Sequence, residues 1–114
     1  MLRRQETNQV KPPPAEHLQL RGAVLLDLRG DDEWAAGQAR GAEHMPLARV
    51  SNETSHLESK DVLTLCRGGS RSGRAADILG AAGVNLRNVA GGMSATASAG
   101  LLVVRDDGAP GTVA

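Results

Sequence analysis

The feature that most constrains the fold is a short apolar run that ends in the only cysteine of the chain. Residues 62–65 have the length of a strand, and Cys66 follows them directly. Two glycines, two serines and two arginines come next, before a helical pattern over residues 73–82. The order strand, tight loop, helix places the cysteine before a helix N-terminus, where free N–H groups and the helix dipole favour a thiolate.

The chain has 114 residues, which is the size of one domain. Thirteen basic and thirteen acidic residues balance, so the net charge does not indicate a nucleic acid as partner. No apolar run reaches the roughly 20 residues of a membrane helix, and residues 5–9 are polar where a signal peptide is apolar. We therefore expect a cytoplasmic protein without membrane contact. Trp34 is the only aromatic residue, so aliphatic side chains, Ala and Met have to build the core.

Apolar runs alternate with helical patterns along the chain. Strands are expected at residues 23–28, 41–47, 62–65 and 84–89, and a further apolar run covers 101–104. Helices are expected at 15–20, 31–37, 73–82 and 93–99, with a loose helix at 47–57. This alternation predicts an α/β fold: a central, mainly parallel sheet of about five strands with helices on both faces. Ligands of such sheets bind beyond the carboxyl ends of the strands, where Asp27 and Cys66 fall.

The two ends of the chain differ from its centre in composition. Residues 1–14 are polar and end in three prolines, which favour an extended, flexible segment. Residues 105–114 are rich in turn signals and are expected to form a loose tail. Residues 15–104 remain as the folded domain.

Several short motifs occur in an order and spacing that resemble a single-domain rhodanese, over residues from about 23 to 104. Residues 66–72 match the active-site form C-R-x-G-x-R-[ST] of that family. The other matches are Asp27 and Arg29 for D-x-R, residues 33–37 for E-[aromatic]-x-x-G, Gly41 with Ala42 and Pro46 for G-A-x-x-[apolar]-P, and Gly91 with Gly92 for a double glycine.

The chain also departs from the family pattern at packing or turn positions. Residues 37–42 read Gly-Gln-Ala-Arg-Gly-Ala where Gly-His-Ile-x-Gly-Ala is usual. Thr96 stands where a tryptophan usually follows the double glycine, and residues 100–103 read Gly-Leu-Leu-Val in place of Gly-x-Pro-Val. These departures affect the packing around the last helix more than the chemistry of the loop.

The resemblance implies a rhodanese-like fold and sulfurtransferase chemistry without a metal or cofactor. Cys66 would take sulfur from a small anionic donor such as thiosulfate as a persulfide and pass it to cyanide, a thiol or a protein. Backbone N–H groups and glycines of a curled loop suit a persulfide, and arginines suit an oxyanion. The expected donor-binding residues are Arg67, Gly68, Gly69, Ser70, Arg71 and Ser72.

Three further residues are expected to support the loop. A carboxylate at a buried strand end needs a partner, so Asp27 should contact Arg29 or N–H groups of the loop. Glu33 should pair with Arg29. Without a role in donor binding, Gly68 and Gly69 would only form a turn, and Arg71 would be a surface residue or a salt-bridge partner.

Other functions compete with sulfur transfer. A non-catalytic module, or one that senses sulfide or redox state through Cys66, would have the same residues. A cysteine phosphatase or arsenate reductase has C-x5-R, whereas Cys66 and Arg71 give C-x4-R, a loop that is one residue shorter. The sequence carries no signal for an oligomeric state.

Overall fold

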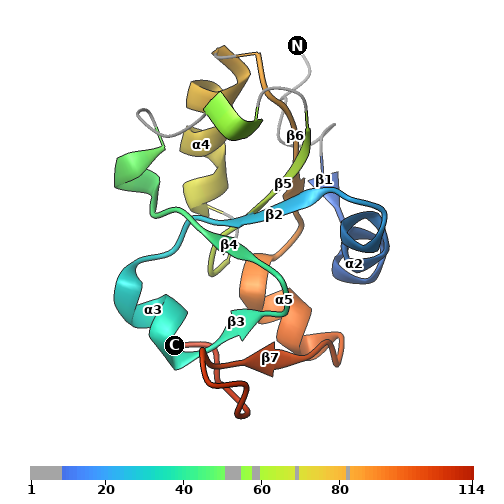
Figure 1. The fold of residues 1–114 in the computed structure, drawn as a ribbon, viewed down its shortest axis with the longest axis vertical. Coiled ribbons are helices and arrows are strands. Elements are labelled where there is room, and N and C mark those ends of the chain that lie inside the picture. Colours follow the sequence, from blue (N-terminus) through green and yellow to red (C-terminus); the bar gives the residue numbers. More distant parts are fainter. Residues whose placement is uncertain (1–8, 51–54, 58–59, 69, 82) are drawn as a thin grey trace.

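Five strands form one parallel sheet in the order β1-β6-β5-β2-β4. The computed structural model describes residues 9–50, 55–57, 60–68, 70–81 and 83–114, and Figure 1 shows their arrangement. The predicted α/β fold with a parallel sheet is confirmed. The strands are β1 Gln9–Val10, β2 Val24–Asp27, β3 Gln38–Ala39, β4 Glu43–His44, β5 Asp61–Leu65, β6 Asn85–Val89 and β7 Val103–Val104. The α-helices are α2 Pro12–Leu20, α3 Asp31–Ala36, α4 Ser70–Ala81 and α5 Gly92–Ser98.

Apolar side chains cover both faces of the sheet because successive residues of a strand point to opposite sides. One buried cluster contains Leu26 and Val62 with Ala75 and Leu79 of α4. The other contains Leu25, Leu63, Leu65 and Val89 with Ala15 of α2 and Met93 of α5. Helix α4 therefore covers one face, and α2 and α5 cover the other. No helix within the described ranges is long and apolar enough to cross a bilayer.

The N-terminal part of the domain begins earlier than the sequence predicts. Residues 9–10 form the edge strand β1, which pairs with β6, and α2 begins at Pro12 within the proline triplet. Prolines are tolerated in the first turn of a helix, because the N–H groups of that turn have no partner within the helix. Regular secondary structure therefore occupies most of residues 9–14, where a flexible segment was expected, whereas residues 1–8 lie outside the described part of the chain.

The loose helix expected at residues 47–57 is not present in its described parts. Two short 3-10 turns, η1 Leu47–Arg49 and η2 Ser55–Leu57, occupy this region, and residues 51–54 are not described. The turns bury Val50 and Leu57 in the cluster under α4. The apolar residues of the segment therefore serve the core without the periodicity of a continuous helix.

The C-terminal segment follows a hydrogen-bonded course where a loose tail was expected. Strand β7 pairs antiparallel with β3 in a second, two-stranded sheet (Figure 1). The N–H of Gly111 donates to Val103 (2.9 Å), and the N–H of Thr112 donates to Ala36 at the end of α3 (2.9 Å). A Cβ at Gly37 would meet the Thr112 carbonyl oxygen at 2.3 Å, so the C-terminal segment packs directly against the backbone of Gly37.

Candidate active site

Cys66 lies directly after β5, at the carboxyl edge of the parallel sheet. The strand before it is held by its neighbour β2: Asp27 is in register with Leu65, and the N–H of Leu28 donates to the Leu65 carbonyl (2.8 Å). Helix α4 begins at Ser70, a few residues further on. The predicted order of strand, loop and helix is present, and we call residues 66–72 the cysteine loop. The Cys66 side chain is completely buried (0% exposed).

The first turn of α5 holds the backbone of the cysteine loop. The N–H of Met93 donates to the Cys66 carbonyl (2.7 Å), and the N–H of Ser94 donates to the Arg67 carbonyl (3.1 Å). These bonds satisfy two N–H groups that have no partner within the helix and fix both carbonyls on the side of α5.

Gly92 makes this contact possible. Its φ is +58°, and a Cβ there would lie 2.1 Å from the Cys66 carbonyl oxygen and 2.8 Å from that of Arg67. The sequence indicated Gly91 and Gly92 only as part of a motif. The role of Gly92 in seating the loop appears only when β5 and α5 are seen side by side.

Replacing Gly92 by alanine should lower the free energy of unfolding by about 3 kcal/mol or more, because a left-handed backbone and a clash with the loop act together. The matched control is Gly100→Ala at the other end of α5, where φ is +80° but no atom lies within 4 Å of the added Cβ. The control should lose only about 1 kcal/mol. Urea unfolding measures both variants, and equal losses would show that the loop does not depend on the close approach.

Asp27 and Arg29 form a completely buried ion pair beside the loop strand (0% exposed for both side chains). The Arg29 Nε lies 3.0 and 3.1 Å from the two carboxylate oxygens, and its Nη2 lies 2.8 Å from Oδ2. The backbone N–H of Arg29 donates to Oδ1 as well (3.0 Å). The sequence left Arg29 and the N–H groups of the loop as possible partners of Asp27, and in the structure Arg29 is the partner.

The remaining donors of Arg29 connect β2 to α3 and to the turn that follows it. Nη2 donates to the Gly37 carbonyl (2.7 Å), and Nη1 donates to the Glu33 carbonyl (3.2 Å). The expected side-chain pairing of Glu33 with Arg29 is therefore replaced by a contact through the backbone. The Glu33 carboxylate instead accepts the N–H of Gly30 at the start of α3 (3.0 Å).

Trp34 and His44 pack together next to this ion pair. Their rings stack at a centroid distance of 4.6 Å, and Nε2 of His44 lies 2.8 Å from the Arg29 carbonyl oxygen. Trp34 is half-buried and belongs to neither of the two buried clusters of the core.

The other predicted loop residues are described only in part. Arg67 and Gly68 are exposed, and the Arg67 Nε donates to the Ala114 carbonyl (2.6 Å). Gly69 lies outside the described residues, as do the side chains of Ser70, Arg71 and Ser72. Donor binding by all six residues, Arg67 and Gly68 included, stays a prediction.

The fold and this site define a class: α/β domains that carry a cysteine loop between a central parallel strand and a helix. The family model of the Rhodanese-like domain matches residues 14–99. The chain therefore belongs to the rhodanese-like domain family, as the motifs predicted.

Proteins of known sequence or structure support this assignment. An uncharacterized protein of Synechocystis is 31% identical over 104 residues, which cover 89% of this chain and 58% of that protein. The chain thus spans a little more than half the length of this relative. A rhodanese-like domain protein of Staphylococcus aureus is 25% identical, with a TM-score of 0.72 over 78% of this chain and 90% of its own.

Two further solved structures share the fold but belong to proteins that are described differently. The reduced Bacillus anthracis CoADR-RHD is 25% identical, with a TM-score of 0.75 over 80% of this chain but 16% of that protein. A Rhodopseudomonas palustris protein described as a possible tyrosine phosphatase is 22% identical, with a TM-score of 0.73 over 82% of each chain. The latter likeness concerns the fold alone.

Proposed function

We propose that this protein is a sulfurtransferase that carries sulfur as a persulfide on Cys66. The Cys66 thiolate attacks the outer sulfur of thiosulfate, the sulfur–sulfur bond of the donor breaks, and sulfite leaves with the electron pair. The acceptor, cyanide or a thiol, then attacks the terminal sulfur of the persulfide and restores the thiolate. Such covalent catalysis divides one difficult transfer into two easier steps.

The observation that carries this proposal is the position of Cys66 between β5 and α4 in a rhodanese-like domain. The N-terminus of the twelve-residue helix α4 favours negative charge on a nearby sulfur. Arg67 adds a guanidinium whose two terminal nitrogens make no hydrogen bond to the described residues. These nitrogens are available for the oxygens of an anionic donor.

The complete burial of Cys66 favours a second candidate, a module that binds or senses sulfur species without turnover. A fully buried sulfur is hard for a small molecule to reach. An enzyme needs this access for a donor and an acceptor in every cycle, whereas a sensor needs it only to be loaded. The two candidates therefore share the persulfide and differ in whether the sulfur leaves again.

The deciding experiment measures the intact mass of the protein before and after incubation with thiosulfate. We expect a gain of one sulfur atom, its loss on addition of cyanide, and the formation of thiocyanate over many cycles. A stable gain without thiocyanate would favour the sensing module. No gain in folded protein, or rapid release of phosphate from an aryl phosphate, would contradict the sulfurtransferase proposal.

A further inference from the structure

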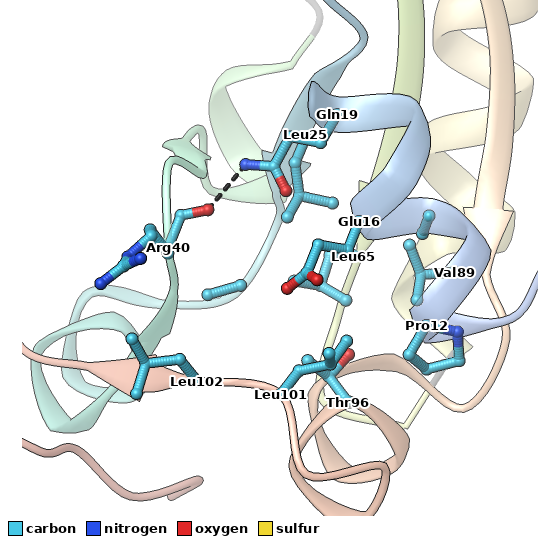
Figure 2. A pocket seen from close by; sticks show the side chains of 12 residues that line it. Pro12, Glu16, Gln19, Leu25, Arg40, Leu65, Val89, Thr96, Leu101 and Leu102 are labelled. Atoms are coloured by element: carbon cyan, nitrogen blue, oxygen red, sulfur yellow. Dashed lines mark hydrogen bonds between the residues drawn. The ribbon is translucent and has the colours of Figure 1, made fainter. Parts of the chain in front are cut away.

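The C-terminal segment follows a path that ends at the cysteine loop. Leu101 and Leu102 lead from α5 to β7, and Figure 2 shows them beside the hollow that α2 lines from the other side. After β7 the chain reverses and pairs with that strand once more at Pro110. Residues 112–114 then pass the end of α3 and reach the Arg67 side chain. We call residues 112–114 the strap.

Backbone contacts and one apolar side chain hold the strap in place. The N–H of Thr112 donates to the Ala36 carbonyl at the end of α3 (2.9 Å). Gly111, directly before the strap, lies so close to Gly37 that a Cβ on Gly111 would meet the Gly37 Cα at 2.7 Å. The half-buried Val113 packs against the core cluster on the face of the sheet that α2 and α5 cover. The path of the strap is therefore fixed before it reaches the cysteine loop.

The last contact of the strap determines how the Arg67 side chain is presented. This side chain is exposed, and without a partner its guanidinium would sample many rotamers. The Ala114 carbonyl accepts a hydrogen bond from Nε (2.6 Å), which occupies one side of the planar guanidinium. The two terminal nitrogens have no hydrogen bond to a described residue. The strap thus leaves the end of the guanidinium, and not its Nε side, for two oxygens of an oxyanion.

We propose that the strap positions Arg67 for the anionic sulfur donor, an inference that rests on the proposed function for the identity of this donor. Ser94 of α5 holds the Arg67 carbonyl (3.1 Å), and Ala114 of the strap holds the side chain. Together they present the guanidinium in one orientation before a donor arrives. Such preorganisation lowers the entropic cost of binding, so the strap should affect the KM for the donor and not the later transfer of sulfur.

The test removes the strap and measures the donor step. A chain that ends at Gly111 should show a KM for thiosulfate about threefold higher, with kcat for thiocyanate formation unchanged. Thr112→Pro, which keeps the length of the chain, removes the N–H that binds Ala36 and should raise the KM in the same way. Circular dichroism and urea unfolding check that both variants are folded. An unchanged KM in both folded variants would overturn the proposal.

A double variant shows whether the strap acts through Arg67. Arg67→Ala should raise the KM for thiosulfate about tenfold, and removal of the strap from this variant should add nothing. Asp106→Ala is the control for a general loosening of the C-terminal segment. It breaks a side-chain hydrogen bond to Gln38 (2.9 Å), leaves the strap intact and should leave the KM unchanged. An equal effect of strap removal with and without the Arg67 side chain would overturn the proposal.

Alkylation of the thiol tests the role of the strap without sulfur transfer. Cys66 is the only cysteine, so the mass gained from iodoacetate or iodoacetamide reports on this residue alone. Burial slows both reagents, so the ratio of their rates is compared. A positioned guanidinium favours the anionic iodoacetate, and removal of the strap should lower the ratio about threefold. This fall in a protein that forms no thiocyanate would contradict sulfur transfer and still support the strap, whereas an unchanged ratio would overturn the role of the strap alone.

Discussion

Replacing Cys66 by serine should abolish sulfur transfer, with a fall in thiocyanate formation of about a thousandfold or more. A serine hydroxyl has nearly the size of the thiol but is not ionised near neutral pH, and it does not form a persulfide. The intact mass of the variant should stay constant in thiosulfate. A thiocyanate assay with wild-type protein in parallel measures the loss.

The serine variant has to remain folded for this result to count. Because Cys66 is completely buried, the new hydroxyl needs a hydrogen bond and costs about 1–2 kcal/mol without one. Cys66→Ala is the matched variant without a polar group and should be equally inactive. Circular dichroism and urea unfolding check both folds, and thiocyanate formation by either variant would show that Cys66 is not the sulfur carrier.

Replacing Arg29 by methionine should lower the free energy of unfolding by about 3–5 kcal/mol, because the change leaves the Asp27 carboxylate buried without its partner. The variant also loses the hydrogen bonds from Arg29 to the Gly37 and Glu33 carbonyls, which join β2 to α3. Native domains are stable by only about 5–15 kcal/mol, so this loss is a large fraction of the whole. Urea unfolding at neutral pH measures it.

Arg105→Met is the control for the loss of an arginine from an ion pair. Arg105 is about half exposed, and its Nε lies 4.0 Å from Asp107, so this variant should change stability by at most about 0.5 kcal/mol. The double variant Asp27→Leu with Arg29→Met removes both buried charges and should recover part of the loss. A loss in Arg29→Met no larger than that of the control would contradict the structural role of the pair.

The sequence predicted the central strands because their apolar runs are strong local signals. Strands β2, β5 and β6 and helix α4 lie close to the expected residues. Strands β1 and β7 have two residues each, too few for a period, and only their pairing with β6 and β3 defines them. The beginning of α2 at Pro12 could not be predicted from the proline triplet, because the same prolines suit an extended segment and a first helical turn.

The candidate site likewise has features that local sequence predicts and features that only the tertiary structure defines. The position of Cys66 and the proximity of Asp27 to Arg29 follow from short-range sequence order and from the shared carboxyl edge of parallel strands. The contact of Gly92 with the Cys66 carbonyl joins residues far apart in the chain through backbone atoms, which leave no residue-type signal except a glycine. Likewise, Arg29 binds the carbonyls of Glu33 in α3 and of Gly37 just after it; the sequence indicated a pairing with Glu33, but not that it runs through the backbone.

The hydrogen bond between Arg67 and Ala114 has a practical consequence for work with this domain. Any polypeptide that follows Ala114, whether natural or added in the laboratory, leaves the domain beside the cysteine loop. An affinity tag at that end would therefore lie beside the loop where we propose that an anionic donor binds, and a polyhistidine tag would change the local charge. Tags and fusion partners should therefore be attached before β1. An assay that compares N-terminally and C-terminally tagged protein would show which properties belong to the domain and which come from the tag.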